Sequence, residues 1–587
     1  MTGPLPPRVC LVDLSSGSVG RSALPEQWVT TYLGGKGLGA RYLYDAVNPT
    51  INPLDPANEL LFVPGPLTGY LPDGGRCPVV TKSPLTGLFL DSYVGGNLGT
   101  SLRAALPDCA GLAVRGAAES TTVLDLRDGT GSLSKQPDLA GATNDEVAER
   151  FPDDLVVSIG PAGEHEVAIA TIATDGGDHH AGRGGAGAVM GSKGLKAIVI
   201  PECTALDAPA AIEALVARRT AAFGESAYGR SYRASGTLET VDIADVTGML
   251  PTRGWQDTRF DGAEGIGIAA VRDAATGREH EDGELPGDFR IATDGYEMVM
   301  RGGTPIALGA GLGIDDIDVV ATLGARCDQL GVDVISAGNL IALATLAVEA
   351  GTLDRDLAFG DKTGPASLLE EIAHRSSSLG DTLAEGVAAA GEHLDVTQQV
   401  PTVKAMAVPS FDARGLPAMA LAFATSDRGA CHRRAIPATV EAAKPAWTNT
   451  QIARLLVEEQ DRRSVLWSLV VDDVTAPLVT EYGMDWLSAL GFDLRERELK
   501  QCGERIWTLT RLFNVREGID RSDDVLPAVF RENGLSERRF DRLLDRYYET
   551  REWDANGLPS RRLLERLDLI DELDPHTLIG GHPLHSA

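Results

Sequence analysis

Short apolar segments separated by turn residues fill the first third of the chain. Between Arg8 and Glu202, runs such as ELLFVPGPL and DLVVSIGPAG alternate with Gly, Pro and Asp. Apolar runs of about four to eight residues with such boundaries predict β-strands. Two helices are expected within this region, at Pro25–Tyr32 and Gly37–Asp45. The pattern therefore predicts a β-rich first domain.

Beyond Ala205 the apolar positions follow the period of an α-helix. Helices are predicted at Ala208–Ser226, Asp315–Glu349, Pro365–Ser376, Leu379–His393, Thr450–Val471, Arg495–Phe513 and Glu537–Glu552. The polar, irregular segment Thr252–Phe289 is expected to form surface loops, and no internal repeat is recognisable. The predicted fold class is α+β, with a β-rich N-terminal domain over residues 1–205. Two mainly α-helical domains would follow, over 206–412 and 413–587, with a division near Val408–Leu416.

Glycine is concentrated in AGRGGAGAVMGSKGLKAI, residues 181–198, which also carries three cationic side chains. Glycine allows backbone N–H groups to approach a bulky anion with no side chain between them. Further glycine segments lie upstream, in YLGGKGLG, GPLTG and RCPVVTKSPLTGLFLDSYVGGNLG. The pattern predicts a cradle for a large ligand that carries phosphate. The alternative is that these glycines only form turns at the ends of strands.

The chain is strongly acidic. Its 84 Asp and Glu residues face 53 Lys and Arg residues, which gives a formal net charge of −31. Such a charge repels nucleic acid and anionic membranes, so neither is expected as a partner. One hypothesis is adaptation to a salt-rich cytoplasm, and the alternative is an ordinary acidic protein. No apolar run is long enough to span a bilayer and no signal peptide is evident, so a cytoplasmic protein is expected.

The seven cysteines are widely scattered, at positions 10, 77, 109, 203, 327, 431 and 502. None forms a C-x-x-C pair, which is the usual signature of a zinc ribbon or of a ferredoxin-type cluster. Reduced and mostly buried thiols are therefore expected.

The glycine segments and several later motifs resemble the aldehyde ferredoxin oxidoreductase family, the tungsten-pterin enzymes. The later motifs are DQLGVD, LAEGV, FDARG, ATSDRGACHRRA, FNVREG and YYETREWDANGLP. The resemblance implies a tungsten (or molybdenum) bis-molybdopterin held by the first domain, and a magnesium ion bridging the pterin phosphates is compatible with it. It further implies oxidation of an aldehyde, ferredoxin as the electron acceptor, and subunits that often pair as a homodimer.

The resemblance also assigns roles to individual residues. The positions that match cofactor-binding motifs are Arg76, Lys82, Gly95, Gly96, Arg183, Gly184, Gly185, Gly187, Asp328, Gly331 and Asp333. His432 in RGACHRRA matches the family's active-site histidine, and an imidazole is suited to proton transfer near neutral pH. Glu297 is the nearest substitute for a glutamate pair of the family. The alternatives are a turn role for each glycine, an exposed helix-end acid at Asp328, and a surface position for His432.

Several positions depart from the family pattern. In VLWSLVVDD, Trp467 stands at a pterin-binding acid, Val470 at a glycine and Asp472 at a cluster cysteine. Tyr93 stands where the family often has an asparagine near the magnesium. The segment 272–300, where three more cluster cysteines are expected, contains none. A 4Fe-4S cluster is expected from the family, but with its four thiolates missing it cannot be bound in the family manner.

Two functions remain open from the sequence. The first is an aldehyde ferredoxin oxidoreductase-like enzyme that oxidises an aldehyde to a carboxylate and passes electrons to an unknown acceptor. The second is a catalytically degenerate paralogue that binds a pterin or serves as the structural partner of another protein. The lost cysteines and the lost acid favour the second, whereas the first-domain motifs and His432 favour the first.

Overall fold

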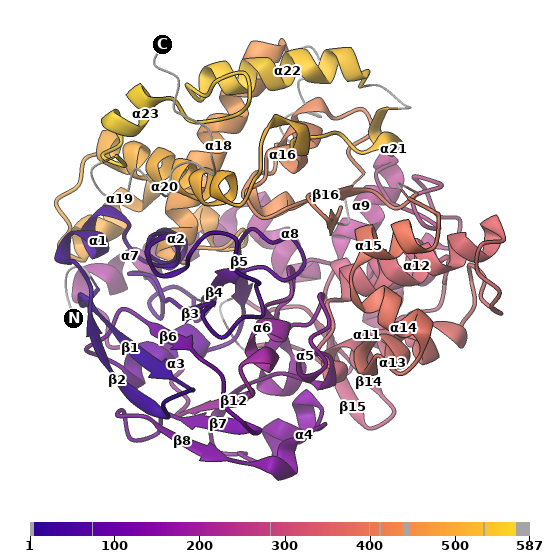
Figure 1. Cartoon of the computed structure of the whole chain (residues 1–587), viewed down its shortest axis with the longest axis horizontal. Coiled ribbons are helices and arrows are strands. Elements are labelled where there is room, and N and C mark those ends of the chain that lie inside the picture. The colour runs from indigo at the N-terminus through magenta and orange to yellow at the C-terminus, as the bar shows by residue number, and fades with distance from the viewer. Residues whose placement is uncertain are drawn as a thin grey trace.

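Two six-stranded sheets make up the first third of the molecule, shown in indigo and purple in Figure 1. The structure is a computed structural model and describes residues 5–570 except 73, 282, 284, 398, 410–411, 438–446, 480 and 532–534. The first sheet contains β1 (Arg8–Asp13), β2 (Ser18–Ala23), β3 (Leu60–Phe62), β4 (Cys77–Lys82), β5 (Phe89–Val94) and β6 (Leu112–Arg115). The second contains β7 (Thr122–Asp125), β8 (Ser132–Lys135), β9 (Leu155–Ser158), β10 (Ile172–Thr174), β11 (His179–Ala181) and β12 (Leu195–Ile200).

The two sheets have the same topology. The first has the strand order β2-β1-β6-β3-β4-β5, and the second, read in the same sense, has β8-β7-β12-β9-β10-β11. In each sheet one neighbouring pair is parallel, β1 with β6 and β7 with β12, and the other pairs are antiparallel. The first third is thus a structural duplication, although no repeat is visible in the sequence.

Burial on both faces explains why several strands appear as continuous apolar runs. Every residue of β4, β5 and β12 is buried, whereas the edge strand β2 is exposed or half-buried throughout. Six helices connect or cover these strands, α1 (Glu26–Thr31), α2 (Gly35–Ala46), α3 (Leu98–Ala105), α4 (Asn144–Glu149), α5 (Pro161–Glu164) and α6 (Ala186–Ser192). The two expected helices correspond to α1 and α2.

The rest of the chain is mainly helical. Its first helices are α7 (Ala210–Glu225), α8 (Ala227–Ser235), α9 (Glu239–Thr247), α10 (Ile268–Ala274), α11 (Ile317–Leu330), α12 (Val334–Ala350), α13 (Gly364–His374), α14 (Ser378–Ala384) and α15 (Val387–His393). Later helices are α16 (Pro417–Ala424), α18 (Asn449–Leu469), α19 (Met484–Ala489), α20 (Glu496–Arg516), α21 (Ala528–Arg531), α22 (Glu537–Thr550) and α23 (Arg561–Arg566). The short strands are β13 (Gly277–Arg278), β14 (Phe289–Thr293), β15 (Tyr296–Met300), β16 (Thr402–Val403) and β17 (Met406–Ala407). The predicted α+β class is confirmed.

Glycine with a positive φ divides two of the predicted helices. The segment Asp315–Glu349 forms α11 and α12, separated at Gly331, whose φ is +72°. The segment Leu379–His393 forms α14 and α15, separated at Gly386, whose φ is +93°. A residue in this conformation ends a helix, and glycine adopts it without a steric cost. Apolar periodicity alone does not reveal such a break.

The expectation of surface loops over Thr252–Phe289 holds for much of the segment but not for all of it. This segment contains α10 and β13, and β13 pairs with β14 in a three-stranded sheet. Trp255 and Val271 are buried in the main core, which gives the segment a packing role that its polar composition concealed. Phe411 of the FDARG motif lies outside the described residues, and the domain division near residues 408–416 stays a prediction.

The seven cysteines are all free thiols, and six of them are buried. Among the described residues, no helix has both the length and the apolar composition needed to cross a membrane.

Candidate cofactor site

The two sheets present their glycine segments in equivalent places. Gly95 and Gly96 follow β5 and precede α3, while Gly184 and Gly185 follow β11 and precede α6. Three of these glycines have a positive φ, +65° at Gly96, +93° at Gly184 and +82° at Gly185. A Cβ added at any of the four, or at Gly187, would lie 2.3 to 2.5 Å from another atom of the chain. Close packing therefore accounts for these glycines, and their contact with a ligand stays a prediction.

Two consecutive histidines of β11 face opposite sides, as successive residues of a strand do. His180 Nε2 lies 3.1 Å from the Asp328 carboxylate, and its Nδ1 lies 2.8 Å from the Thr171 hydroxyl. His179 instead approaches the first-sheet glycines, and its Nδ1 lies 3.1 Å from the Arg301 guanidinium. Burial, together with the nearby Arg301 and Arg76, lowers the pKa of His179 well below its usual value. Strand β11 thus contacts the first-sheet glycines through His179 and the end of α11 through His180.

Two of the predicted cofactor-binding cations are paired with carboxylates from the C-terminal part of the chain. Arg76 Nε lies 2.8 Å from the carboxylate of Asp472, the residue that stands at the position of a family cluster cysteine. Lys82 Nζ lies 2.6 Å from the Glu517 carboxylate and also donates to the carbonyl of Ile51. Arg76 acts electrostatically on His179 and so belongs to the candidate site. Lys82 is buried against Glu517 and Ile51 instead.

The third cation, Arg183, connects the second glycine segment to α12. Its Nε lies 3.3 Å from the carboxylate of Asp333, and its guanidinium donates to the carbonyl of Ala407. Asp333 is the N-cap of α12, because its carboxylate also accepts from the backbone N–H of Ser336 at 3.0 Å. Burial lowers the pKa of Arg183, while the Asp333 carboxylate raises it. The structure therefore brings the predicted Arg183 and Asp333 into direct contact.

A buried ionic cluster lies between the first domain and the loop that follows α16. Lys36, on α2, forms ion pairs with Asp427 and, at 3.5 Å, with Asp91 of β5. Arg434 approaches the same two acids, with Nη2 2.7 Å from Asp91 Oδ1 and Nε 3.5 Å from Asp427 Oδ1. Arg428 donates to the carbonyl of Asp91 at 2.6 Å. Three cations and two carboxylates thus leave this cluster one positive charge in excess.

Next to this cluster lie Cys431 and His432. Arg428 Nη2 donates to Cys431 Sγ at 3.0 Å. Burial by itself would raise the pKa of the Cys431 thiol, but Arg428 and Arg434 bring it below its usual value. Burial, followed by the charge of Arg433, lowers the pKa of His432 to about 3. The imidazole of His432, which is half-buried, is neutral near pH 7 because its pKa is so low.

Glu297, the second predicted catalytic residue, lies on the exposed face of the β14–β15 hairpin. Its carboxylate accepts a hydrogen bond from Thr276 at 2.7 Å and lies 3.7 Å from the Arg290 guanidinium. The side chain is about half exposed, at 48%. These contacts belong to the surface of the three-stranded sheet, and a catalytic role for Glu297 stays a prediction without structural support.

The residues that sequence reasoning missed are Lys36, Asp91, Asp427, Arg428 and Arg434. All five lie inside segments that had been noticed for their glycines or for His432, namely GGKGLG, LDSYVGG and SDRGACHRRA. A charged residue among apolar residues and glycines, as in FLDSYVGG, could have indicated the cluster. Such a residue is expected to be buried, and a buried charge needs a partner of opposite charge. Among the described residues, no group of three or more His, Cys, Asp or Glu side chains is placed to hold a metal ion.

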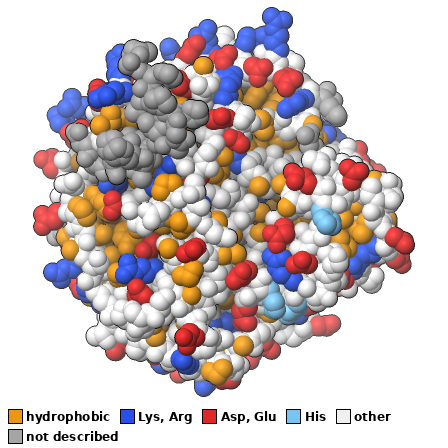
Figure 2. All heavy atoms as spheres, in the orientation of Figure 1, with side chains coloured by type: hydrophobic (Ala, Val, Ile, Leu, Met, Phe, Trp, Pro, Cys, Tyr) orange, Lys and Arg blue, Asp and Glu red, His pale blue; other side chains and the backbone are white. Residues whose placement is uncertain are grey.

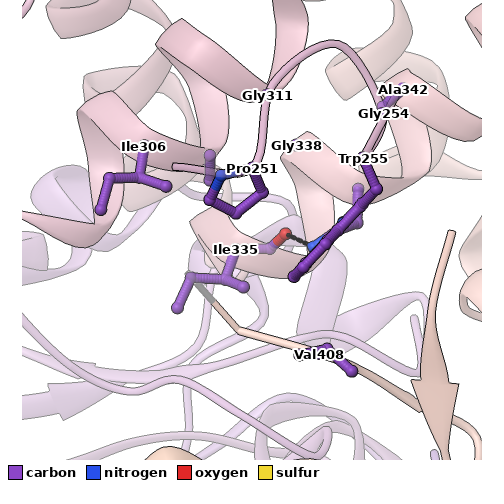
Figure 3. A pocket seen from close by; sticks show the side chains of 11 residues that line it. Pro251, Gly254, Trp255, Ile306, Gly311, Ile335, Gly338, Ala342 and Val408 are labelled. Carbon is purple, nitrogen blue, oxygen red and sulfur yellow. Dashed lines mark hydrogen bonds between the residues drawn. The ribbon is translucent and has the colours of Figure 1, made fainter. Parts of the chain in front are cut away.

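An apolar hollow of about 20 Å³ lies between α12 and the segment that contains Pro251 and Trp255 (Figure 3). Pro251, Trp255, Ile306, Ile335 and Val408 contribute to its wall. The indole N–H of Trp255 donates to the Asn339 side chain at 2.9 Å, which fixes the ring across the hollow.

Two family models match the chain. One is described as aldehyde ferredoxin oxidoreductase, N-terminal domain, and matches residues 9–202, and the other, described as domains 2 & 3 of the same protein, matches 215–569. Curated relatives named tungsten-containing aldehyde ferredoxin oxidoreductase are 31% identical in Pyrococcus furiosus and 32% identical in Thermococcus kodakarensis, each over 96% of this chain and 99% of the relative. A WOR-like subunit of aliphatic sulfonate oxidoreductase from Pyrococcus furiosus is 28% identical over 95% of this chain and 96% of its own length.

A solved structure shares the fold. The BamBC active-site complex of benzoyl coenzyme A reductase, with bound 1,5 dienoyl-CoA, gives a TM-score of 0.83 at 22% identity, covering 97% of this chain and 98% of that one. The family models match the β-rich first third and most of the helical remainder, and the relatives align along nearly the whole length. The chain therefore belongs to the aldehyde ferredoxin oxidoreductase family of oxidoreductases.

Proposed function

We propose that this chain is a metallopterin oxidoreductase that converts an aldehyde and water into a carboxylate, with tungsten or molybdenum as the metal. The observation that carries the proposal is the meeting of buried cations from distant parts of the chain, beside the neutral imidazole of His432. Arg183 and Arg428 both act electrostatically on that imidazole. The names of the tungsten-containing relatives support the metal and the substrate class.

Buried donors in the cluster fit a cofactor that carries phosphate. Arg428 Nε and Arg434 Nη1 are buried and have no hydrogen-bond partner among the described residues. A buried donor without an acceptor costs about 1–3 kcal/mol, so a polyanionic ligand at this place would remove a penalty that the protein otherwise carries. When bound, the metallopterin would supply the two-electron oxidation. Arg428 and Arg434, which carry these donors, are therefore candidates to hold its phosphates, together with Arg76 and Arg183 that the sequence predicts.

The chain itself would manage the protons. Oxidation of an aldehyde by water yields the carboxylic acid, two protons and two electrons. His432 is neutral near pH 7 and so has a ring nitrogen free to take a proton from the water that supplies the oxygen, although a pKa of about 3 makes it a weak base in the protein alone. An anionic cofactor beside Arg183 and Arg428, two of the charges that lower this pKa, would raise the pKa and strengthen the base. The cationic side chains of Arg428 and Arg434 favour negative charge nearby, as forms on a deprotonated carboxylic acid.

The apolar hollow favours a small hydrocarbon substituent on the aldehyde. Val408 follows Ala407, whose carbonyl Arg183 contacts, and Ile335 lies two residues after Asp333. At about 20 Å³ the hollow accepts a methyl-sized group, and Trp255 would have to move for anything larger.

The residues do not fit a 4Fe-4S cluster in the family position. Asp472 pairs with Arg76, and its carboxylate accepts from the backbone N–H groups of Val474 and Thr475. Asp472 therefore cannot replace the fourth thiolate, because its carboxylate already has partners and because a carboxylate is a poor ligand for the iron of such a cluster. Electrons would therefore leave to an acceptor by another route, and the acceptor and a homodimer both stay predictions.

Elemental analysis of the purified protein tests this proposal. A host that makes both cofactors should yield about one tungsten or molybdenum per chain, with iron far below one equivalent. Absence of both metals after expression in such a host would contradict the proposal.

Replacing His432 tests the proton step. His432→Gln should lower kcat/KM for aldehyde oxidation, measured with an artificial electron acceptor, by about 100-fold or more, because general base catalysis contributes about that much. The metal content should not change. His374→Gln, at a half-buried surface histidine, is the matched control and should retain activity. Unaltered turnover in His432→Gln would remove this residue from the mechanism.

A second candidate function is a catalytically degenerate paralogue that binds a pterin or acts as a structural partner. It is favoured by the pairing of Arg76 with Asp472 and of Arg183 with Asp333, which neutralises two predicted phosphate ligands within the protein. A protein that contains pterin but oxidises no aldehyde would support this function over the first.

A further inference from the structure

Each of the two equivalent sheets packs against the end of its own long helix. Gly65 follows β3, and a Cβ there would lie 2.5 Å from the carbonyl of Leu469, at the end of α18. Gly160 follows β9, the equivalent strand, and a Cβ there would lie 2.4 Å from the carbonyl of Leu330, at the end of α11. The duplication of the sheets therefore extends to the helices, and the candidate site consists of two equivalent halves.

The two helix ends have the same backbone geometry. Gly331 ends α11 with φ +72° and ψ 47°, and Val470 ends α18 with φ +60° and ψ 51°. Both conformations are left-handed, which glycine adopts easily and a β-branched residue does not. Asp328 lies three residues before Gly331, and Trp467 lies three residues before Val470. Asp328 and Trp467 thus hold equivalent positions in the two halves.

An ion pair recurs two residues beyond each helix end. In the second half Asp333 pairs with Arg183 at 3.3 Å, and in the first half Asp472 pairs with Arg76 at 2.8 Å. The two acids hold equivalent positions, whereas the arginines come from different places, Arg76 before β4 and Arg183 after β11. Both halves thus have an acid paired with an arginine, so this pairing does not distinguish them.

The halves differ at the position of Asp328 and Trp467. The Asp328 side chain is a carboxylate that faces His180. Trp467 is an indole, 1% exposed, and its ring lies against that of Tyr93 with 4.1 Å between the ring centroids. The Trp467 N–H donates to the carbonyl of Arg433 at 3.2 Å, and the Tyr93 hydroxyl donates to Asp91 at 2.6 Å. The polar groups of both rings are thus used inside the protein.

At the spacing that Tyr93 has from its glycines, the second half has a residue with no side chain. Tyr93 lies two residues before Gly95, and Gly182 lies two residues before Gly184. Among the described residues, a Cβ added at Gly182 would have one neighbour within 4 Å, the Asp333 carboxylate at 3.5 Å. The space that Tyr93 fills in the first half is therefore not filled from this position in the second.

We infer that the chain binds a single pterin, in the half formed by the second sheet and the end of α11, and that Trp467 and Tyr93 close the other half. The inference rests on the proposed function and makes it more specific. A pterin presents several N–H donors along its edge, which a carboxylate accepts and an indole, a donor only, does not. Two rings in contact also leave no gap for a third ring between them.

The ratio of pterin to metal in the purified holoenzyme tests this inference. Metal would be measured by mass spectrometry, and pterin by the fluorescence of its oxidised derivative. The expected result is about one pterin per metal atom, in place of the two that a bis-pterin cofactor contains. A ratio of two would overturn the inference and leave the proposed function intact, whereas protein without pterin or metal would overturn both.

Two matched variants assign the pterin to one half. Asp328→Asn should lower the pterin content about tenfold or more, since a hydrogen bond to a charged group contributes about 1.5–3 kcal/mol. Trp467→Phe should leave the content unchanged, because it keeps an aromatic ring against Tyr93. Thermal unfolding of both variants would show that they are folded. Loss of pterin in Trp467→Phe, or its retention in a folded Asp328→Asn, would overturn the assignment.

Discussion

At the scale of single residues, burial sets the charge of Glu59. This side chain precedes β3, is 4% exposed, and has one carboxylate oxygen without a hydrogen-bond partner among the described residues. Burial raises the pKa of Glu59 to about 7, although the nearby Lys193 acts in the opposite direction. The folded state thus keeps a proton, between about pH 4.5 and 7, that the unfolded state has released.

Stability should therefore fall as the pH rises through that window, because the folded state binds more protons than the unfolded state. Glu59→Gln removes this dependence. Between pH 4.5 and pH 8 the free energy of unfolding of the native protein should fall by about 3 kcal/mol more than that of the variant. Urea unfolding at both pH values measures it, with the exposed Glu26→Gln as a control that shows no such change.

Thr50 carries backbone strain that a single substitution should relieve. Its φ is +63°, its side chain is exposed, and its backbone N–H donates to the Glu517 carboxylate at 2.9 Å. Thr50→Gly keeps that hydrogen bond and should raise the free energy of unfolding by about 1 kcal/mol. Thr50→Ala retains a Cβ and should change it much less. Equal effects of the two variants in chemical unfolding would show that the backbone conformation is not the cause.

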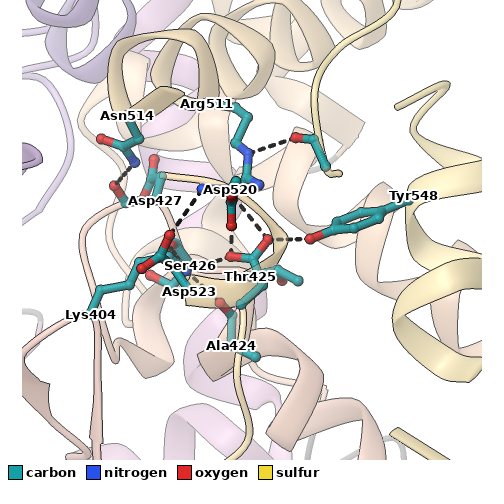
Figure 4. A network of polar contacts seen from close by, with 12 residues as sticks. Lys404, Ala424, Thr425, Ser426, Asp427, Arg511, Asn514, Asp520, Asp523 and Tyr548 are labelled. Atoms are coloured by element: carbon teal, nitrogen blue, oxygen red, sulfur yellow. Dashed lines mark hydrogen bonds and ion pairs between the residues drawn. The ribbon is translucent and has the colours of Figure 1, made fainter. Parts of the chain in front are cut away.

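At the scale of elements, the β16–β17 hairpin is anchored by one buried lysine. Lys404 and Ala405 form its turn with φ values of +50° and +63°. Lys404 Nζ lies 2.7 Å from the Asp524 carboxylate and donates to the carbonyls of Ala424 and Ser426 (Figure 4). Arg511 and Tyr548 also bind Asp524, so the hairpin is connected to α20 and α22.

Lys404→Met should therefore lower the free energy of unfolding by about 3 kcal/mol or more, because it leaves part of a buried charge network without its partner. Lys362→Met is the matched control. Lys362 is 47% exposed in its ion pair with Asp316, and a surface pair of this kind contributes about 1 kcal/mol or less. Thermal unfolding would compare the two, and similar losses would mean that burial of Lys404 is not what matters.

Local pattern predicted most of these elements. The helices α7, α18, α20 and α22 begin and end within about three residues of their predicted bounds, because their apolar positions follow one face. The breaks at Gly331 and Gly386 were missed, since a glycine with a positive φ changes the backbone without changing the apolar pattern. The duplication of the two sheets was also missed, because equivalent strands share a topology without sharing residues.

At the scale of the whole molecule, the charge of −31 is the dominant feature. Acidic and basic side chains are interspersed over the face seen in Figure 2, with apolar side chains between them. Like charges over the whole surface repel one another, and this repulsion extends about 30 Å at 0.01 M salt but only about 3 Å at 1 M. The folded state concentrates these charges and is therefore favoured by salt.

We expect Tm to rise by several degrees when KCl is increased from about 0.01 M to 1 M, and to rise further at concentrations above 1 M. Sucrose, which does not screen charge, should not reproduce the steep first part of this rise. Differential scanning calorimetry measures both series. Equal stability in dilute buffer and in KCl would instead identify an ordinary acidic protein.

The sequence by itself determined the α+β class, the order of most elements, the family and the loss of the cluster cysteines. These depend on apolar spacing and on motifs that are contiguous in the chain. Only the tertiary structure decided the partners of the candidate residues: that Arg76 faces Asp472, that Lys82 turns to Glu517, and that Tyr93 lies against Trp467. Each of these contacts joins the first hundred residues to the C-terminal part of the chain, and no periodicity or motif within either segment determines which side chains will meet.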